Sequence, residues 1–239
     1  MGTENRMMRR IRRIVGILRL YYRPILLEYW GIGKIVASSK TIWFMLKNHH
    51  SVELLHCYDF LRTSLTEAPA NGMILEFGVS SGGTIRTISE AVPDRLVYGF
   101  DSFDGLPEPW GPLMKGQFKQ SELPNVPSNV VLVIGLFQDT LEDFLKVHTE
   151  DIAFVHMDAD IYSSTKYVLF TLGKYNRIIP GMVIQFNEFI SINYPKAWVE
   201  GEYGAFKDFV EQFGVTFEYV RISYGNVSVR ILGIEGWKG

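Results

Sequence analysis

From residue 73 onward, hydrophobic positions form short continuous runs, and the stretches between them have helical spacing. The runs that predict strands are Met73–Phe77, Leu96–Phe100, Val130–Ile134, Ile152–Met157 and Met182–Phe186. The stretches that predict helices are Thr84–Ala91, Thr140–Val147, Ser163–Leu172 and Tyr203–Phe213. A continuous apolar run is typical of a strand that is buried on both faces. The alternation of such strands with helices therefore predicts an α/β fold, a parallel sheet with helices on both of its faces.

The chain ends with a different pattern. Two further apolar runs, Phe217–Ile222 and Val227–Ile231, flank the turn Tyr224-Gly225-Asn226. Strands joined by so short a turn are antiparallel to each other, so we expect an antiparallel final pair. The stretch 104–127 holds five prolines and predicts a long loop. Loops of this length in compact domains are usually functional, and we expect a lid.

Composition and charge set the organisation of the chain. With 239 residues, 47% of them hydrophobic, and a net charge of −2, the chain can bury a full core and is not expected to be disordered. Residues 1–40 carry a net charge of +7 and residues 41–239 a net charge of −9. We therefore expect a basic leader, 1–40, followed by a single domain, 41–239. An acidic body excludes a general nucleic-acid binder, because phosphate binding needs a basic face.

The leader contains an amphipathic stretch at residues 8–22. Ile11, Ile14, Val15 and Leu18 fall at helical spacing and arginines flank them. Such a helix either packs on the body or a second subunit, or lies on an anionic membrane surface. No apolar run is long enough for a transmembrane helix, and we see no secretory signal. The single cysteine, Cys57, excludes an internal disulfide framework and fits a reducing, cytoplasmic location.

Candidate chemistry lies where the predicted strands end, because open α/β sheets bind ligands at the carboxyl ends of their strands. The first strand leads from Glu76 into the glycine-rich turn 78–84, whose spacing differs from the dinucleotide GxGxxG pattern. Asp101 follows the second strand, where an acidic residue accepts hydrogen bonds from ribose hydroxyls. Glu76 can balance the cationic part of an amino-acid tail. Together, Glu76 and Asp101 indicate an adenosine-containing ligand with such a tail, S-adenosylmethionine.

The remaining strand ends supply further candidates. After the third strand, Phe137 could flank an adenine and Gln138 could bond to its edge. After the fourth strand, Asp158 and Asp160 are placed to bind a divalent cation or to act as a general base. Asn187 and Glu188 follow the fifth strand and offer further oxygen ligands. Three aromatic residues either shape an acceptor pocket or pack in the core or the lid: Trp110, Trp198 and Tyr203.

The combination of LEFGVSSGGT, VYGFDSFDGLPEPW, GLFQDTL, HMDADIYSST and PGMVIQFNEF resembles the macrocin and novobiocin-type O-methyltransferases. The resemblance covers Met73 to Ile231. It implies a Rossmann-like sheet of seven strands, S-adenosylmethionine as cofactor, a hydroxyl of a sugar or natural product as acceptor, a mobile lid, a homo-oligomer and, often, a magnesium ion.

Carried over by position, the resemblance also assigns roles to residues. It places Glu76 and Gly78 at the methionine tail of the cofactor. The other cofactor residues are Ser80, Ser81 and Thr84 near that tail, Asp101 at the ribose, and Ser102 beside Asp101. Asp158 becomes the first metal ligand and a candidate base, with Asp160 as the second candidate base. The family has a second acid where this chain has Asn187, next to Glu188, so whether a metal is bound stays open.

Three functions compete at this point. A methyltransferase accounts for the glycine-rich turn, Asp101 and the acids. A metal-dependent glycosyltransferase accounts for Asp158-Ala159-Asp160 as a DxD motif, but not for the glycine-rich turn with Asp101. A non-catalytic, membrane-associated scaffold is favoured only by Asn187.

Overall fold

The computed structural model describes residues 32–53, 55–190 and 200–236. Its centre is a seven-stranded sheet with the order β3-β2-β1-β4-β5-β7-β6. The strands are β1 (Met73–Phe77), β2 (Val97–Asp101), β3 (Val130–Ile134), β4 (Ile152–Met157), β5 (Val183–Phe186), β6 (Thr216–Ser223) and β7 (Asn226–Gly233). β1 to β5 are parallel, whereas β7 is antiparallel to both β5 and β6. The predicted Rossmann-like sheet with an antiparallel final pair is confirmed.

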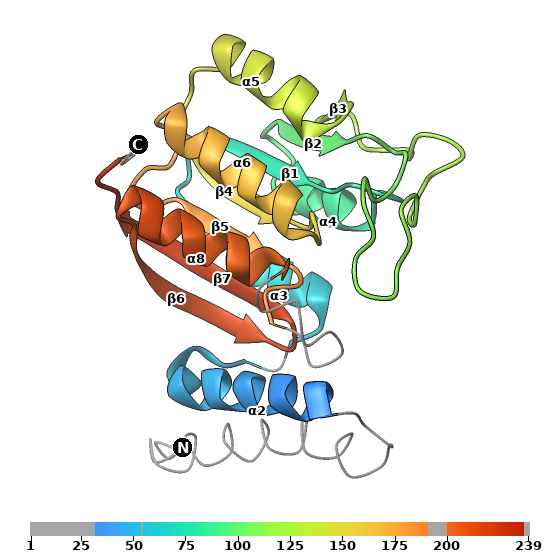
Figure 1. Cartoon of the computed structure of the whole chain (residues 1–239). Helices are drawn as coiled ribbons and strands as arrows, with labels where there is room; N and C mark the ends of the chain where they lie inside the picture. The colour runs from blue at the N-terminus through green and yellow to red at the C-terminus, as the bar shows by residue number, and fades with distance from the viewer. Residues whose placement is uncertain (1–31, 54, 191–199, 237–239) are drawn as a thin grey trace, which may run out of the picture.

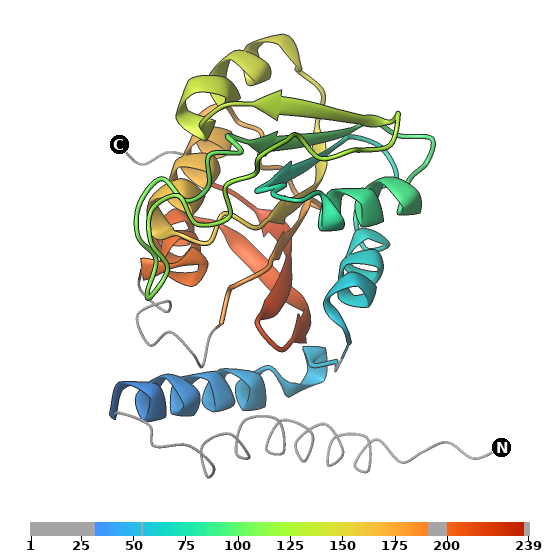
Figure 2. The same cartoon turned by 90° about the vertical axis from the view of Figure 1, so that its right-hand side faces the viewer.

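Helices cover both faces of this sheet (Figures 1 and 2). Helices α5 (Phe137–Val147), α6 (Tyr162–Lys174) and α8 (Glu202–Phe213) lie on one face. Helices α3 (Cys57–Leu65) and α4 (Gly83–Ala91) lie on the other. Helix α2 (Ile32–Lys47) and the short 3-10 helix η1 (His49–Ser51) precede them, and Figure 1 shows α2 beyond the β6–β7 hairpin.

The two-sided cover explains why the strand runs are continuously apolar. Along β1, Leu75 and Phe77 pack into the larger core cluster with residues of α5, α6 and α8. Ile74, which directly precedes Leu75, packs into the smaller cluster with residues of α3 and α4. Because successive side chains point to opposite faces, both faces of the strand must be hydrophobic.

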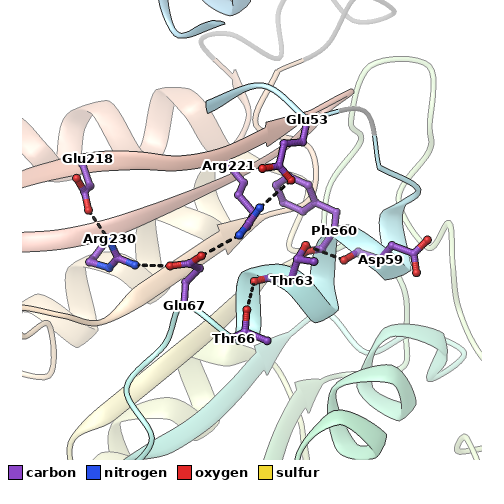
Figure 3. Close-up of polar contacts among 9 residues, drawn as sticks. All are labelled: Glu53, Asp59, Phe60, Thr63, Thr66, Glu67, Glu218, Arg221 and Arg230. Atoms are coloured by element: carbon purple, nitrogen blue, oxygen red, sulfur yellow. Dashed lines mark hydrogen bonds and ion pairs between the residues drawn. The ribbon is translucent and has the colours of Figure 1, made fainter. Parts of the chain in front are cut away.

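A chain of ion pairs ties the segment after α3 to the far edge of the sheet (Figure 3). Arg221 of β6 donates to Glu53 at 2.7 Å and to Glu67 at 2.8 Å. Arg230 of β7 donates to the other oxygen of Glu67 at 2.7 Å and to Glu218 at 2.6 Å. The side chains of the two arginines are mostly buried, at 19% and 29% exposed, and the network holds α3 against β6 and β7.

The structure differs from the sequence prediction in its helices. α5 begins at Phe137 rather than at Thr140, so Phe137 and Gln138 belong to the first turn of a helix and not to a loop. α2 and α3 were not predicted, and α2 runs across residue 40, the predicted end of the leader. The amphipathic stretch 8–22 lies outside the described residues. Among the helices that are described, none is long and apolar enough to cross a membrane.

Candidate functional site

A cleft of about 330 Å³, here called the strand-end cleft, opens where β1, β2 and β4 end. The right-hand side of Figure 1 shows this edge of the sheet, with the loop 104–127 beside it. The predicted site residues that line the cleft are Gly78, Ser80, Asp101, Ser102, Phe137, Gln138, Asp158, Asp160, Asn187 and Glu188. Residues that follow five separate strands therefore meet in one cavity.

The carboxylate of Asp101 holds the turn after β1 in place. Its Oδ2 accepts hydrogen bonds from the backbone N–H groups of Val79, at 2.8 Å, and Ser80, at 2.7 Å. Its Oδ1 accepts a third bond, from the N–H of Phe103 at 2.7 Å. A carboxylate can accept about four hydrogen bonds, so one acceptor position remains for a ligand hydroxyl. Asp101 thus shapes the cleft as well as lining it.

The glycine-rich turn needs the conformational freedom of glycine at Gly78. This residue has φ +96°, and a Cβ there would lie 2.0 Å from the carbonyl oxygen of Asp158. The backbone after β1 therefore passes directly against the end of β4. A hydrogen bond from the N–H of Asp158 to the carbonyl oxygen of Phe77, at 2.9 Å, joins the two segments. Ser80, whose N–H bonds to Asp101, also has a left-handed backbone conformation, with φ +48°.

Three predicted cofactor residues do not line the cleft. Glu76 is fully buried beneath it, and its Oε1 lies 2.8 Å from Nδ1 of the fully buried His156. Burial raises the pKa of Glu76, and the hydrogen bond from His156 opposes that shift. The pair links β1 to β4 two residues before Gly78 and Asp158. Ser81 is exposed on the turn, and Thr84 is half-buried at the start of α4.

The acidic residues after β4 and β5 form one electrostatic group. Burial, followed by the negative charge of Asp158, raises the pKa of Asp160 to about 8 and that of Glu188 to about 7. Burial also raises the pKa of Asp158, and a hydrogen bond from Nδ2 of Asn187 to its Oδ1, at 2.9 Å, opposes the shift. Asp160 has φ +59°, a conformation that is unusual for a residue with a side chain.

Sequence reasoning missed one member of this group, Glu202 at the start of α8. It is fully buried, and its Oε2 accepts a hydrogen bond from the backbone N–H of Glu188 at 2.9 Å. Burial, and then the charge of Asp158, raise its pKa well above the ordinary value. Glu202 therefore fixes the backbone that presents Asn187 and Glu188. In the sequence, an acid at a helix start gives only a capping signal.

The predicted metal ligands, Asp158, Asn187 and Glu188, do not fit a divalent cation as they are arranged. Their oxygen donors have suitable chemistry for Mg²⁺. However, the amide of Asn187 presents its nitrogen, not its oxygen, to Asp158. Within residues 32–53, 55–190 and 200–236, no three His, Cys, Asp or Glu side chains are close enough together to hold a metal ion.

A second cleft of about 850 Å³ adjoins the first and is lined by α2, the loop 104–127, α6 and α8. Trp110, which is only 8% exposed, lines both clefts. It packs in a small apolar cluster with Leu106 and Ile161, which seats the loop on the start of α6. The loop is tied there by Ser163, whose hydroxyl donates to Glu108 at 2.7 Å. Tyr203 lines the second cleft as well, and Trp198 lies outside the described residues.

The strand order and the parallel arrangement of β1 to β5 define a Rossmann-like fold, with the glycine-rich turn after β1 and Asp101 at the end of β2. Two solved methyltransferases show the likeness directly. The calicheamicin methyltransferase CalS11 superposes with a TM-score of 0.57 at 19% identity, covering 96% of this chain and 94% of that chain. The O-methyltransferase NovP superposes with a TM-score of 0.53 at 22% identity, covering 74% of this chain and 79% of that chain.

A second, apo structure of CalS11, described there as a TDP-rhamnose 3'-O-methyltransferase, superposes with a TM-score of 0.50 at 18% identity, covering 96% of each chain. No family model matches the chain, and no curated protein sequence matches it. At these identities the likeness establishes the fold, while the activity has to be argued from the site.

Proposed function

We propose that the protein is an S-adenosylmethionine-dependent O-methyltransferase that acts on a hydroxyl of a sugar or a related natural product. The observation that carries the proposal is the pair of adjoining clefts. The strand-end cleft is lined by the glycine-rich turn, Asp101 and the acids after β4. It shares Trp110 with the second cleft. Two substrates that exchange a group need adjoining sites of this kind.

The strand-end cleft suits the cofactor. Asp101 has one acceptor position left for a ribose hydroxyl, and the turn at Gly78 brings backbone, rather than side chain, to the ligand. Phe137 and Gln138, at the start of α5, can contact a base at the other end of the cleft. When bound, S-adenosylmethionine supplies an electrophilic methyl group on its sulfonium sulfur.

The residues between the clefts have two tasks. They align the acceptor oxygen with the methyl carbon and sulfur, and they remove the hydroxyl proton. Asp158 and Asp160 line the strand-end cleft, and Ile161 and Tyr162, next in the chain, line the second cleft. One of the two aspartates accepts the proton as the oxygen–carbon bond forms, and the electron pair of the broken carbon–sulfur bond stays on sulfur.

The second cleft suits the acceptor. Its walls include Trp43, Trp110, Tyr162 and Tyr203, and charged side chains such as Lys207 lie among them. Flat aromatic side chains with polar groups between them fit a ring that has apolar faces and hydroxyl edges. A sugar ring has this form. This supports the sugar acceptor among the natural products that the sequence resemblance implies.

Isotope transfer tests the proposal. The protein is incubated with S-adenosylmethionine that is ¹³C-labelled at the methyl group and with a panel of glycosides, and products are analysed by mass spectrometry. We expect a labelled methyl ether on at least one glycoside, and a strong loss of product for Asp158→Asn and Asp160→Asn together. Glu142→Gln, on the outer side of α5, is the control and should keep its activity. Labelled product that persists in the double variant would contradict the proposed proton acceptors.

A further inference from the structure

A compact polar cluster lies on the wall of the second cleft. The hydroxyl of Tyr162 donates to Oδ2 of Asp208 at 2.5 Å. Nζ of Lys166 donates to the Tyr162 hydroxyl at 2.6 Å and to the same Asp208 oxygen at 3.2 Å. Tyr162 and Lys166 lie one turn apart on α6, and Asp208 comes from the neighbouring helix α8. Tyr162 and Asp208 both line the cleft.

The cluster is held in its charged form. The hydrogen bond from Tyr162 lowers the pKa of Asp208, burial opposes it, and the bond from Lys166 adds to the lowering. The bond to Tyr162, and then the bond to Asp208, raise the pKa of Lys166. Lys166 also lies 5.0 Å from the centre of the Tyr162 ring and 5.1 Å from that of Phe170. The cleft wall therefore presents the Asp208 carboxylate and the Tyr162 phenol, and the Lys166 ammonium group bonds to both of them.

The internal contacts leave hydrogen-bonding capacity in the cluster. A carboxylate accepts up to about four hydrogen bonds and an ammonium group donates three. Two of the three Lys166 protons are used within the cluster, and Tyr162 and Lys166 together bond to one oxygen of Asp208. Asp208 lines the cleft and its side chain is 41% exposed. Lys166 does not line the cleft, but its side chain is 36% exposed and its Nζ lies 3.2 Å from the Asp208 carboxylate.

The location of the cluster relates it to the reaction. Asp160 lines the strand-end cleft, and Tyr162, two residues further along, lines the second cleft. Trp110 lines both. A ring seated against Trp110 and bonded to the cluster would therefore lie next to the point where the two clefts meet. This placement of the ring rests on the proposed function, because a methyl transfer requires one of its hydroxyls to face the methyl group.

We infer that Tyr162, Lys166 and Asp208 form the anchor of the acceptor and bind two neighbouring hydroxyls of its ring. One hydroxyl donates to the Asp208 carboxylate, and its neighbour accepts from the Lys166 ammonium group. A carboxylate beside an ammonium group matches such a diol, since one accepts and the other donates. The three side chains are positioning residues: they fix the ring so that a third hydroxyl, outside the anchor, is the one methylated.

Saturation-transfer NMR tests the inference on the full-length protein saturated with S-adenosylhomocysteine. The probes are methyl α-D-mannopyranoside and methyl α-D-glucopyranoside, which carry neighbouring hydroxyls, and 2-methoxytetrahydropyran, which has the ring without them. UDP-glucose is added as a separate arm, because the same ring occurs in free glycosides and in sugar nucleotides. We expect signals from at least one glycoside or from the glucose ring of UDP-glucose, and none from 2-methoxytetrahydropyran.

Variants then locate the binding. Asp208→Asn should raise the dissociation constant of the bound probe about tenfold, which is the loss expected for one hydrogen bond to a charged group. Tyr162→Phe should also raise it, because the variant lacks the hydrogen bond that holds Asp208 in position. Tyr175→Phe is the matched control, because Tyr175 caps the other end of α6, lines neither cleft, and its hydroxyl likewise donates to a carboxylate, that of Glu142, at 3.0 Å. Thermal unfolding of each variant separates loss of binding from loss of folding. If the cluster only joined α6 to α8, the variants would unfold at lower temperature and bind the probes like the wild type.

Two results would overturn the inference. One is that no probe with neighbouring hydroxyls binds, and the other is that the folded variants bind them as well as the control does. S-adenosylhomocysteine binding, measured on the same samples, keeps this failure distinct from failure of the proposed function. A protein that binds S-adenosylhomocysteine but no diol would retain the methyltransferase proposal and lose the anchor.

Discussion

Replacing Asp101 should affect folding and cofactor binding together, because its carboxylate does two things. It accepts three backbone hydrogen bonds, from Val79, Ser80 and Phe103, and it lines the strand-end cleft. A residue that contacted only the ribose of the ligand could be replaced without lowering the free energy of unfolding. The structure instead predicts that Asp101→Ala leaves three half-buried N–H groups without an acceptor.

The size of the effect follows from those three bonds. A hydrogen bond to a charged acceptor contributes about 1.5–3 kcal/mol, with the lower end appropriate here because Asp101 is partly exposed. Losing all three should lower the free energy of unfolding by roughly 3–5 kcal/mol. Asp101→Asn keeps one oxygen and can serve either the Val79 and Ser80 pair or Phe103. Its cost should be smaller, about 1.5–3 kcal/mol.

Urea denaturation monitored by circular dichroism gives the unfolding free energies, and calorimetry gives the affinity for S-adenosylhomocysteine. The control is Asp104→Asn, three residues after Asp101, which removes an exposed ion pair with Lys119. It should change stability by less than about 1 kcal/mol. Asp101→Ala with wild-type stability would refute the reasoning that this carboxylate holds the turn. Wild-type affinity in a folded variant would refute its place in the cofactor site.

Three further predictions follow from single contacts. Gly78→Ala should abolish S-adenosylhomocysteine binding and lower the melting temperature, because its Cβ would lie 2.0 Å from the Asp158 carbonyl; a variant that binds normally would show that the turn is misplaced. Glu67→Gln should lower the unfolding free energy by about 1 kcal/mol at pH 7 relative to the exposed control Glu90→Gln. Since Arg221 and Arg230 lower the pKa of Glu67 from its ordinary 4.5, this stabilisation is full above that value and should disappear as the pH falls through the lowered one; a pH-independent difference between the two variants would exclude the ion pairs as its cause. Trp110→Ala should raise the KM for the acceptor more than tenfold in the isotope-transfer assay, because it removes a wall shared by both clefts, and an unchanged KM would remove Trp110 from the acceptor site.

The central strands could be predicted from the sequence because their side chains pack into hydrophobic clusters on both faces of the sheet. Leu75 and Ile74 pack into different clusters, so the run around them is apolar at every position, which is a strong signal. The residues at the strand ends followed from topology, since parallel strands bring their carboxyl ends to one edge. Asp101 and Asp158 meet in one cleft for this reason.

Other parts of the site depend on contacts that no local pattern records. Tyr162 and Asp208 bond across 46 positions of the chain, and their pairing is set by the packing of α6 on α8. The burial of Glu202 likewise depends on how α8 lies against the segment after β5. Glu76 sits in a strand end like Asp101, yet it turns to His156 in the neighbouring strand instead of the cleft. The sequence gives its position and not the direction of its side chain.

The central claim is that the strand-end cleft binds the methyl donor. Isothermal titration of the wild-type protein with S-adenosylhomocysteine tests it most directly, since it needs no knowledge of the acceptor. We predict a single site with micromolar affinity, weakened in a folded Asp101→Asn variant and unchanged in Asp104→Asn. The absence of binding at millimolar S-adenosylhomocysteine, above all if UDP-glucose binds in the same cleft, would contradict the account and favour a glycosyltransferase.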